Sequence, residues 1–108
     1  MRYEVRLTPD AARDLEAMHA FLAEADSMKA ANHVLDRLMA AVETLERLPQ
    51  RGSRLRELET LGFHAYRQIL LKPWRVIYRV IGPQVFIYVI ADGRRDMRSL
   101  LTQRLLDS

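Results

Sequence analysis

The sequence contains no cysteine, and it has few of the residues that interrupt regular structure, with four glycines and four prolines among its 108 residues. Without thiols, disulfide bridges, thiolate metal sites and cysteine catalysis are excluded. No stretch approaches the roughly 20 consecutive apolar residues of a membrane-spanning helix, and residues 1–6 hold no apolar signal core. We therefore expect one cytoplasmic domain over residues 1–108, large enough to fold without a metal ion.

Charge is distributed unevenly along the chain. Residues 1–50 hold six basic and nine acidic side chains, whereas residues 51–108 hold eleven basic and five acidic ones. Ten of those eleven are arginines, whose planar guanidinium groups suit phosphates and carboxylates. A basic second half indicates an anionic partner, either a nucleic acid or an acidic protein segment, unless the charges only solvate a surface.

The first half of the chain predicts one strand and two helices. Residues 2–7 alternate polar and apolar, which is the period of a half-buried strand. Thr8 and Pro9 are suited to the N-cap and the first position of a helix. A second helix is expected between Ser27 and Pro49. Two helices joined by a short connection form an antiparallel hairpin, and their apolar stripes need a sheet to cover them.

The second half predicts three strands and a short helix. Three runs of β-branched and aromatic residues, separated by short breaks that contain proline, span residues 64–71, 74–81 and 84–90. Residues 96–106 return to helical spacing. The predicted fold class is α+β, in the order β-α-α-β-β-β plus a short C-terminal helix, with the helical hairpin packed on one face of an antiparallel sheet.

Alternation along the middle strand of this meander assigns two arginines to one face. The apolar face carries Trp74, Val76, Tyr78 and Val80. Because this apolar set belongs against the helices, Arg75 and Arg79 are expected on the opposite face, which is predicted to be partly open. Strand pairing is expected to bring Arg67 beside them.

No cofactor site is expected, since the glycines stand singly and His19, His33 and His64 are scattered without carboxylates at metal-ligand spacing. What remains is an arginine constellation that consists of Arg67, Arg75, Arg79, Arg94, Arg95 and Arg98. Clustered guanidinium groups can clamp an RNA phosphate and stabilise its developing charge without a metal, or they can hold acidic side chains of a protein. Tyr66 and Tyr78 either stack on a base or lie in the core.

Four segments carry a family resemblance in their order and spacing: residues 7–15 (LTPDAARDL), 48–52 (LPQRG), 66–67 with 74–80 (YR and WRVIYRV), and 89–97 (VIADGRRDM). On these segments the chain resembles the RelE/ParE superfamily of small bacterial toxins from type II toxin-antitoxin modules, over nearly its whole length. The resemblance implies a hetero-oligomer with a cognate antitoxin, whose acidic and partly disordered segment folds over the toxin. It implies no cofactor.

The superfamily contains two activities. RelE-type members are ribosome-dependent mRNA endonucleases, and the similarity places Arg67, Arg75 and Arg95 at positions of their basic residues. Two further positions differ, because a second basic residue is replaced here by Ile69 and a C-terminal tyrosine by Leu101. These departures argue against RNA cleavage.

ParE-type members bind DNA gyrase and trap its cleaved-DNA complex without being enzymes, and the tail of this chain is closer to theirs. The resemblance therefore favours gyrase over mRNA and implies that no residue is catalytic. The implied target-binding residues are Arg75, Arg79, Arg94, Arg95, Asp96 and Arg98. A non-toxic binding module is the third interpretation, since it also explains the uneven charge.

Overall fold

A computed structural model describes residues 2–60, 62 and 64–106, and its main elements follow the predicted order. Residues 4–59 contain β1 (Glu4–Leu7), α1 (Pro9–Ala25), α2 (Met28–Glu43), the 3-10 helix η1 (Thr44–Glu46), β2 (Ser53–Arg54) and α3 (Arg56–Glu59). The second half contains β3 (Tyr66–Leu71), β4 (Trp74–Ile81), β5 (Gln84–Asp92) and α4 (Met97–Leu106). The short elements η1, β2 and α3 have no counterpart in the predictions.

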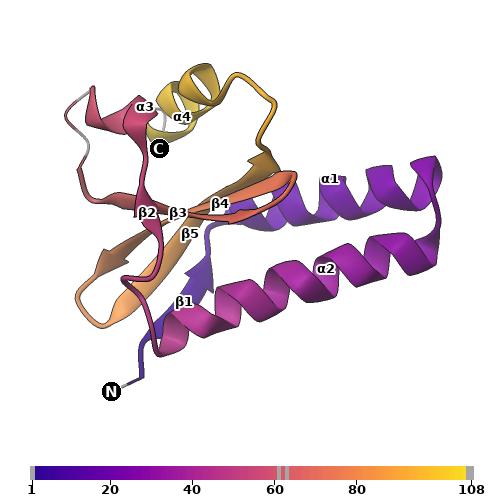
Figure 1. The fold of residues 1–108 in the computed structure, drawn as a ribbon, viewed down its shortest axis with the longest axis horizontal. Helices are drawn as coiled ribbons and strands as arrows, with labels where there is room; N and C mark the ends of the chain where they lie inside the picture. The colour runs from indigo at the N-terminus through magenta and orange to yellow at the C-terminus, as the bar shows by residue number, and fades with distance from the viewer. Residues whose placement is uncertain (1, 61, 63, 107–108) are drawn as a thin grey trace.

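The strands form a single mixed sheet in the order β1-β5-β4-β3-β2 (Figure 1). Strands β3, β4 and β5 make the predicted antiparallel meander, so the α+β class is confirmed. At one edge, however, β1 lies parallel to β5 rather than antiparallel. Two parallel neighbours are joined through a long connection, here the helices and the rest of the meander, and no local sequence pattern reveals such a pairing.

Both predicted helix starts are confirmed by their caps. The Thr8 hydroxyl accepts a hydrogen bond from the Ala11 N–H at 3.1 Å, with Pro9 in the first turn of α1. The Ser27 hydroxyl accepts one from the Ala30 N–H at 3.0 Å at the start of α2. These bonds satisfy N–H groups that lack a partner inside the helix, which explains why these residues set the boundaries.

The α1–α2 hairpin covers one face of the sheet and makes the first core. The helices contribute Leu15, Met18, Leu38 and Val42, and the sheet contributes Val76, Tyr78, Val85 and Ile87. Leu38 and Tyr78 are completely buried. Trp74 and Val80 pack against the same cluster, so the predicted apolar face of β4 is confirmed.

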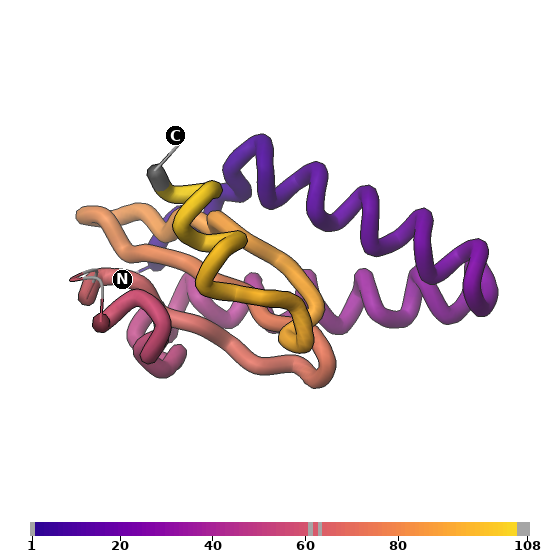
Figure 2. Tube along the Cα trace, turned by 90° about the horizontal axis from the view of Figure 1, so that it is seen from above, coloured from indigo at the N-terminus to yellow at the C-terminus, as the bar shows by residue number. Residues whose placement is uncertain are grey.

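Two helices cover part of the opposite face of the sheet, and the predicted opening remains beside β3, where Leu70 is 57% exposed. Figure 2 shows α4 lying across the sheet on the side away from the hairpin, and α3 lies beside it. Leu58 of α3, Leu101 of α4 and Ile77 of β4 belong to a second core, in which Leu101 and Ile77 are fully buried. The closing helix was predicted from its spacing, but α3 has only four residues and therefore no readable period.

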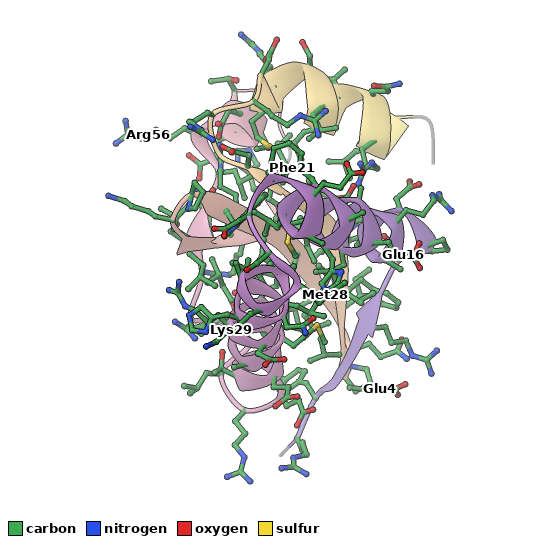
Figure 3. All side chains as sticks on the ribbon, turned by 90° about the vertical axis from the view of Figure 1, so that its right-hand side faces the viewer. Glu4, Glu16, Phe21, Met28, Lys29 and Arg56 are labelled. Atoms are coloured by element: carbon green, nitrogen blue, oxygen red, sulfur yellow. The ribbon has the colours of Figure 1, made fainter. Side chains whose placement is uncertain are left out.

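The far end of the hairpin extends beyond the sheet (Figure 1). Figure 3 views the molecule from that end, where Phe21 and Met28 lie close to the connection between the two helices. Phe21 and Met28 are 65% and 58% exposed, so this end of the hairpin presents two large apolar residues to solvent. Within the described ranges, no helix combines the length and hydrophobicity needed to cross a membrane.

Candidate functional site

The predicted arginine constellation is divided between the two faces of the sheet. Directly paired residues of neighbouring strands share a face, and Arg67 of β3 pairs with Tyr78 of β4, whose ring belongs to the first core. Arg67 therefore lies on the hairpin face. Arg75 and Arg79 lie on the other face, as predicted, so the expectation that strand pairing gathers all three is wrong.

Arg75 makes a bidentate ion pair with another residue of the same chain. Its Nη1 and Nη2 donate to the two carboxylate oxygens of Glu57 in α3 at 2.9 and 3.1 Å, and its Nε donates to the Gln68 side-chain oxygen at 2.8 Å. The Arg75 side chain is only 12% exposed. Its hydrogen bonds to Glu57 lower the pKa of that carboxyl, although burial acts in the opposite direction. The guanidinium group therefore ties α3 to the sheet, a role that the sequence did not indicate.

This ion pair makes stability depend on pH. The pKa of Glu57 in the folded protein lies below its usual value of 4.5. The ion pair therefore contributes fully to the free energy of unfolding above pH 4.5, and this contribution is lost as the pH falls through the folded-state pKa. We expect Glu57→Gln to lower the free energy of unfolding by about 1 kcal/mol at pH 7, with the difference from the wild type vanishing in acid. Urea unfolding between pH 7 and pH 2 measures it. Glu59→Gln, on the same helix, is the control, and an equal loss at every pH would contradict the assignment.

Arg67 organises the turn that leads from the hairpin to β2. Its Nη1 donates to the Gly52 carbonyl at 2.8 Å and to the Gln50 carbonyl at 3.4 Å. In the same turn, the Tyr78 hydroxyl donates to the Pro49 carbonyl at 2.8 Å and accepts from the Gly52 N–H at 2.9 Å. Tyr78 is fully buried, so it is a core residue and not a platform for a base.

Arg79 lies over an aromatic ring. Its guanidinium carbon is 5.6 Å from the centre of the Tyr66 ring, and Tyr66 meets Tyr88 edge to face at 5.4 Å. The Arg79 Nε is buried and has no hydrogen-bond partner among the described residues. Tyr66 is only 8% exposed and belongs to the second core. This arrangement favours a packing role for the ring and leaves Arg79 partly exposed.

The segment from the end of β5 to the first turn of α4 carries the exposed part of the constellation. Arg94, Arg95 and Arg98 are all exposed. Arg94 forks onto the Asp92 carboxylate, which lowers the pKa of Asp92 to about 2. Asp96 accepts hydrogen bonds from the N–H and hydroxyl of Ser99 at 3.2 and 2.7 Å, which lowers the pKa of Asp96 and caps the start of α4. Arg95 and Arg98 make no ion pair within the described residues.

An apolar groove adjoins Arg95. It has a volume of about 360 Å³ and is lined by Met18 and Phe21 of α1, by Trp74 of β4 and by the end of β5. Phe21 was not singled out in the sequence, but its position is readable there. The apolar stripe of α1 runs through Leu15, Met18 and Leu22, and an aromatic side chain outside that stripe points away from the core.

The histidines take structural or exposed positions. His19 Nε2 lies 2.7 Å from the Asn32 side-chain oxygen and so links α1 to α2. His33 and His64 are exposed. No group of three histidine, aspartate or glutamate side chains that could hold a metal ion occurs in the part of the chain that the structure describes.

The sequence of the chain is similar to those of known toxin proteins. A family model described as the ParE toxin of the type II toxin-antitoxin system parDE matches residues 5–97. Toxin ParE3 of Caulobacter vibrioides is 29% identical over 91 residues, which cover 84% of this chain and 87% of that protein.

Solved structures show a similar fold. The chromosomal ParDE toxin-antitoxin system from P. aeruginosa contains a chain with a TM-score of 0.69 and 18% identity, covering 84% of this chain and 96% of that one. A chain of the toxin-antitoxin complex RelBE2 from Mycobacterium tuberculosis has a TM-score of 0.62 and 23% sequence identity to this protein. The match covers 85% of this chain and 99% of that one. A mutant of the E. coli toxin RelE in the free state has a TM-score of 0.66 and 14% sequence identity. This match covers 99% of this chain and 98% of that one.

Proposed function

Because the chain belongs to the ParE toxin family of type II toxin-antitoxin systems, we propose that it inhibits growth by poisoning DNA gyrase and that a cognate antitoxin neutralises it. In this proposal the protein acts in the cytoplasm as a binding protein. It traps gyrase on cleaved DNA and does not itself break a covalent bond, so it needs neither a catalytic residue nor a cofactor.

The observation that carries the choice of target is the internal use of the arginines. A metal-free nuclease has to aim several cationic groups at one phosphate. Here Arg67 is bound to backbone carbonyls on the hairpin face, and Arg75 is bound to Glu57 on the opposite face. The positions of the two missing nuclease residues, Ile69 and Leu101, are buried in the first and second cores respectively. This arrangement supports gyrase rather than mRNA as the target.

The proposed gyrase-binding surface lies around the start of α4. Arg94, Arg95 and Arg98 would contact the target there, beside the apolar groove that contains the exposed Phe21. Arginine and large aromatic side chains together are typical of the residues that dominate binding energy at protein interfaces. Of the other proposed target-binding residues, Asp96 would support this surface by capping α4, whereas Arg75 is bound to Glu57 and Arg79 lies over the Tyr66 ring.

The exposed arginines give a direct prediction. We expect the double variant Arg95→Ala/Arg98→Ala to raise the protein concentration that halves gyrase supercoiling by about tenfold, because both side chains are exposed and neither forms an ion pair with another described residue. Arg37→Ala, which removes an exposed arginine from α2, should leave that concentration unchanged. Equal effects of both variants would indicate a nonspecific charge effect and contradict the assignment.

Two parallel assays test the target itself. Purified protein is incubated with gyrase and plasmid DNA, and separately with ribosomes translating a defined mRNA. We expect loss of supercoiling with accumulation of cleaved DNA, while the mRNA stays intact. Codon-positioned mRNA cuts with unaffected gyrase would replace this proposal by the RelE-like nuclease, and unimpaired growth on induced expression would favour the non-toxic binding module.

A further inference from the structure

The segment from Asp92 to Arg95, which we call the β5–α4 turn, is fixed by contacts within the chain. The Asp92 carboxylate accepts a hydrogen bond from the Arg94 N–H at 2.9 Å, and the Asp92 carbonyl accepts one from the Arg95 N–H at 3.1 Å. The Gly93 N–H donates to the Pro73 carbonyl, between β3 and β4, at 2.7 Å. Because three successive backbone N–H groups are bonded, the path of the backbone into Arg95 is set before any target binds.

Gly93 lets this turn lie directly on β4. A Cβ added at Gly93 would lie 3.1 Å from Arg75 Cδ, 3.2 Å from Arg75 Cγ and 3.2 Å from the Pro73 carbonyl oxygen. The two carbon contacts are shorter than the optimum of about 3.5 to 4.0 Å. The φ of Gly93 lies outside the left-handed region, unlike those of Gly62 and Gly82, so glycine serves close approach here. A larger residue has to lift the turn off Arg75.

Arg75 supports Gly93 because its side chain is held at the far end. Its guanidinium group is bound to the Glu57 carboxylate and to the Gln68 side-chain oxygen, and the side chain is only 12% exposed. The part of Arg75 that meets the β5–α4 turn is therefore its methylene stem and not its charge. A series of contacts runs from Glu57 of α3 through Arg75 and Gly93 to Arg95.

The same turn borders the apolar groove of the proposed gyrase-binding surface. Trp74 and Asp92 pair across β4 and β5, and both line that groove together with Arg95. The hydrogen bond from Gly93 reaches Pro73, the residue before Trp74. The position of the turn therefore sets how far the charge of Arg95 stands from the apolar groove.

We propose that Gly93 and Arg75 are positioning residues of the gyrase-binding surface, which hold the β5–α4 turn where Arg95 lies beside the apolar groove. Arg75 acts through its stem and does not contact the target. A turn that is already ordered loses less conformational entropy on binding, so displacing it weakens binding even when Arg95 itself is intact. This assignment rests on the proposed function for the identity of the target.

Two glycine variants test the assignment in the gyrase supercoiling assay. We expect Gly93→Ala to raise the protein concentration that halves supercoiling by about fivefold, because the turn and Arg95 are displaced. Gly82→Ala is the control, since Gly82 has a φ of 57° and lies at the opposite end of β4. It should lower the thermal stability without changing that concentration. No effect of Gly93→Ala, or losses of inhibition that follow the losses of stability in both variants, would overturn the proposal.

Two variants of Arg75 separate support of the turn from direct contact with the target. Arg75→Met keeps a carbon and a sulfur where Cγ and Cδ lie beneath Gly93 but carries no charge, whereas Arg75→Ala removes that support. Both lose the bonds to Glu57, so this loss cancels in the comparison. Arg75→Met should weaken inhibition by at least about threefold less than Arg75→Ala. Equal losses would show that the guanidinium group itself is required, which overturns the positioning role.

Amide hydrogen exchange needs no target and separates this proposal from the proposed function. The Arg95 amide should exchange at least about threefold faster in Gly93→Ala than in the wild type, while that of Val76 in the first core changes little. Unchanged exchange at Arg95 overturns the role of Gly93, whatever the target is. A wild-type chain that leaves gyrase unaffected overturns the proposed function instead. Thermal unfolding of each variant shows that the chain is folded.

Discussion

Replacing Tyr78 with phenylalanine is expected to lower the free energy of unfolding by about 3 kcal/mol. The change removes no apolar packing, because the ring remains in the first core. It removes only the hydroxyl, which donates to the Pro49 carbonyl and accepts from the Gly52 N–H. Burial raises the pKa of this hydroxyl, so it stays protonated and keeps its donor role at neutral pH. Two buried backbone groups lose their partner at once, and urea unfolding at pH 7 measures the cost.

A second tyrosine provides the matched control for this prediction. Tyr88 packs against Tyr66 at the second core, and among the described residues its hydroxyl does not bridge two backbone groups of a turn as that of Tyr78 does. Tyr88→Phe should therefore cost less than about 1 kcal/mol. Equal losses in the two variants would mean that the bonds to Pro49 and Gly52 add nothing beyond the burial of a hydroxyl, and the account of the turn would fail.

Local signals in the sequence were enough for the helices and the meander. Thr8 and Ser27 cap their helices through the atoms that the sequence predicts, because a cap is a contact between residues only a few positions apart. The face of β4 followed from alternation for the same reason. What failed was pairing at a distance: the parallel contact of β1 with β5, and the four-residue α3 that covers part of the second face.

The strand register alone determines which face of the sheet carries Arg67. A two-residue connection between β3 and β4 pairs Leu71 with Trp74, and counting back along both strands places Arg67 opposite Tyr78. Because alternation places Tyr78 on the apolar face, the same register places Arg67 on that face, away from Arg75 and Arg79.

The sequence shows more arginines than are available to a partner, because some of them form ion pairs inside the protein. The contact of Arg75 with Glu57 joins β4 to a helix that no pattern predicts, and that of Arg104 with Asp14 spans 90 positions. Spacing carries no information on either ion pair. Among the described arginines of the second half, Arg95 and Arg98 at the start of α4 and Arg54 and Arg56 near β2 are exposed and form no internal ion pair.

The pair formed by Asp14 and Arg104 closes an open edge of the sheet. Strand β1 pairs with β5 only as far as Ile87, so the outer edge of β5 beyond that residue has no neighbouring strand among the described residues. There the Asp14 carboxylate accepts from the Ile90 N–H at 3.0 Å, and Arg104 Nη1 donates to the Tyr88 carbonyl at 2.9 Å. The two side chains, one from α1 and one from α4, satisfy backbone groups that β1 leaves unpaired.

We expect Asp14→Ala to lower the free energy of unfolding by about 2 to 3 kcal/mol. Arg104 donates to both Asp14 oxygens, at 2.9 and 3.1 Å, and the two side chains are only 15% and 16% exposed. Removing the carboxylate leaves a poorly hydrated guanidinium group, an unpaired Ile90 N–H and a weakened contact between α4 and α1. Guanidinium-chloride unfolding at pH 7 measures the loss, and exchange of the α4 amides should increase.

A double-mutant cycle separates the ion pair from the backbone contacts. Arg104→Met keeps much of the side-chain volume, and the double variant with Asp14→Ala leaves no unpaired charge behind. The double variant should therefore lose less stability than the two single changes together, by at least about 1 kcal/mol. Strict additivity would show that Asp14 and Arg104 act on β5 independently. In that case the Arg104 bond to the Tyr88 carbonyl and the second core would hold α4 to the sheet without help from Asp14.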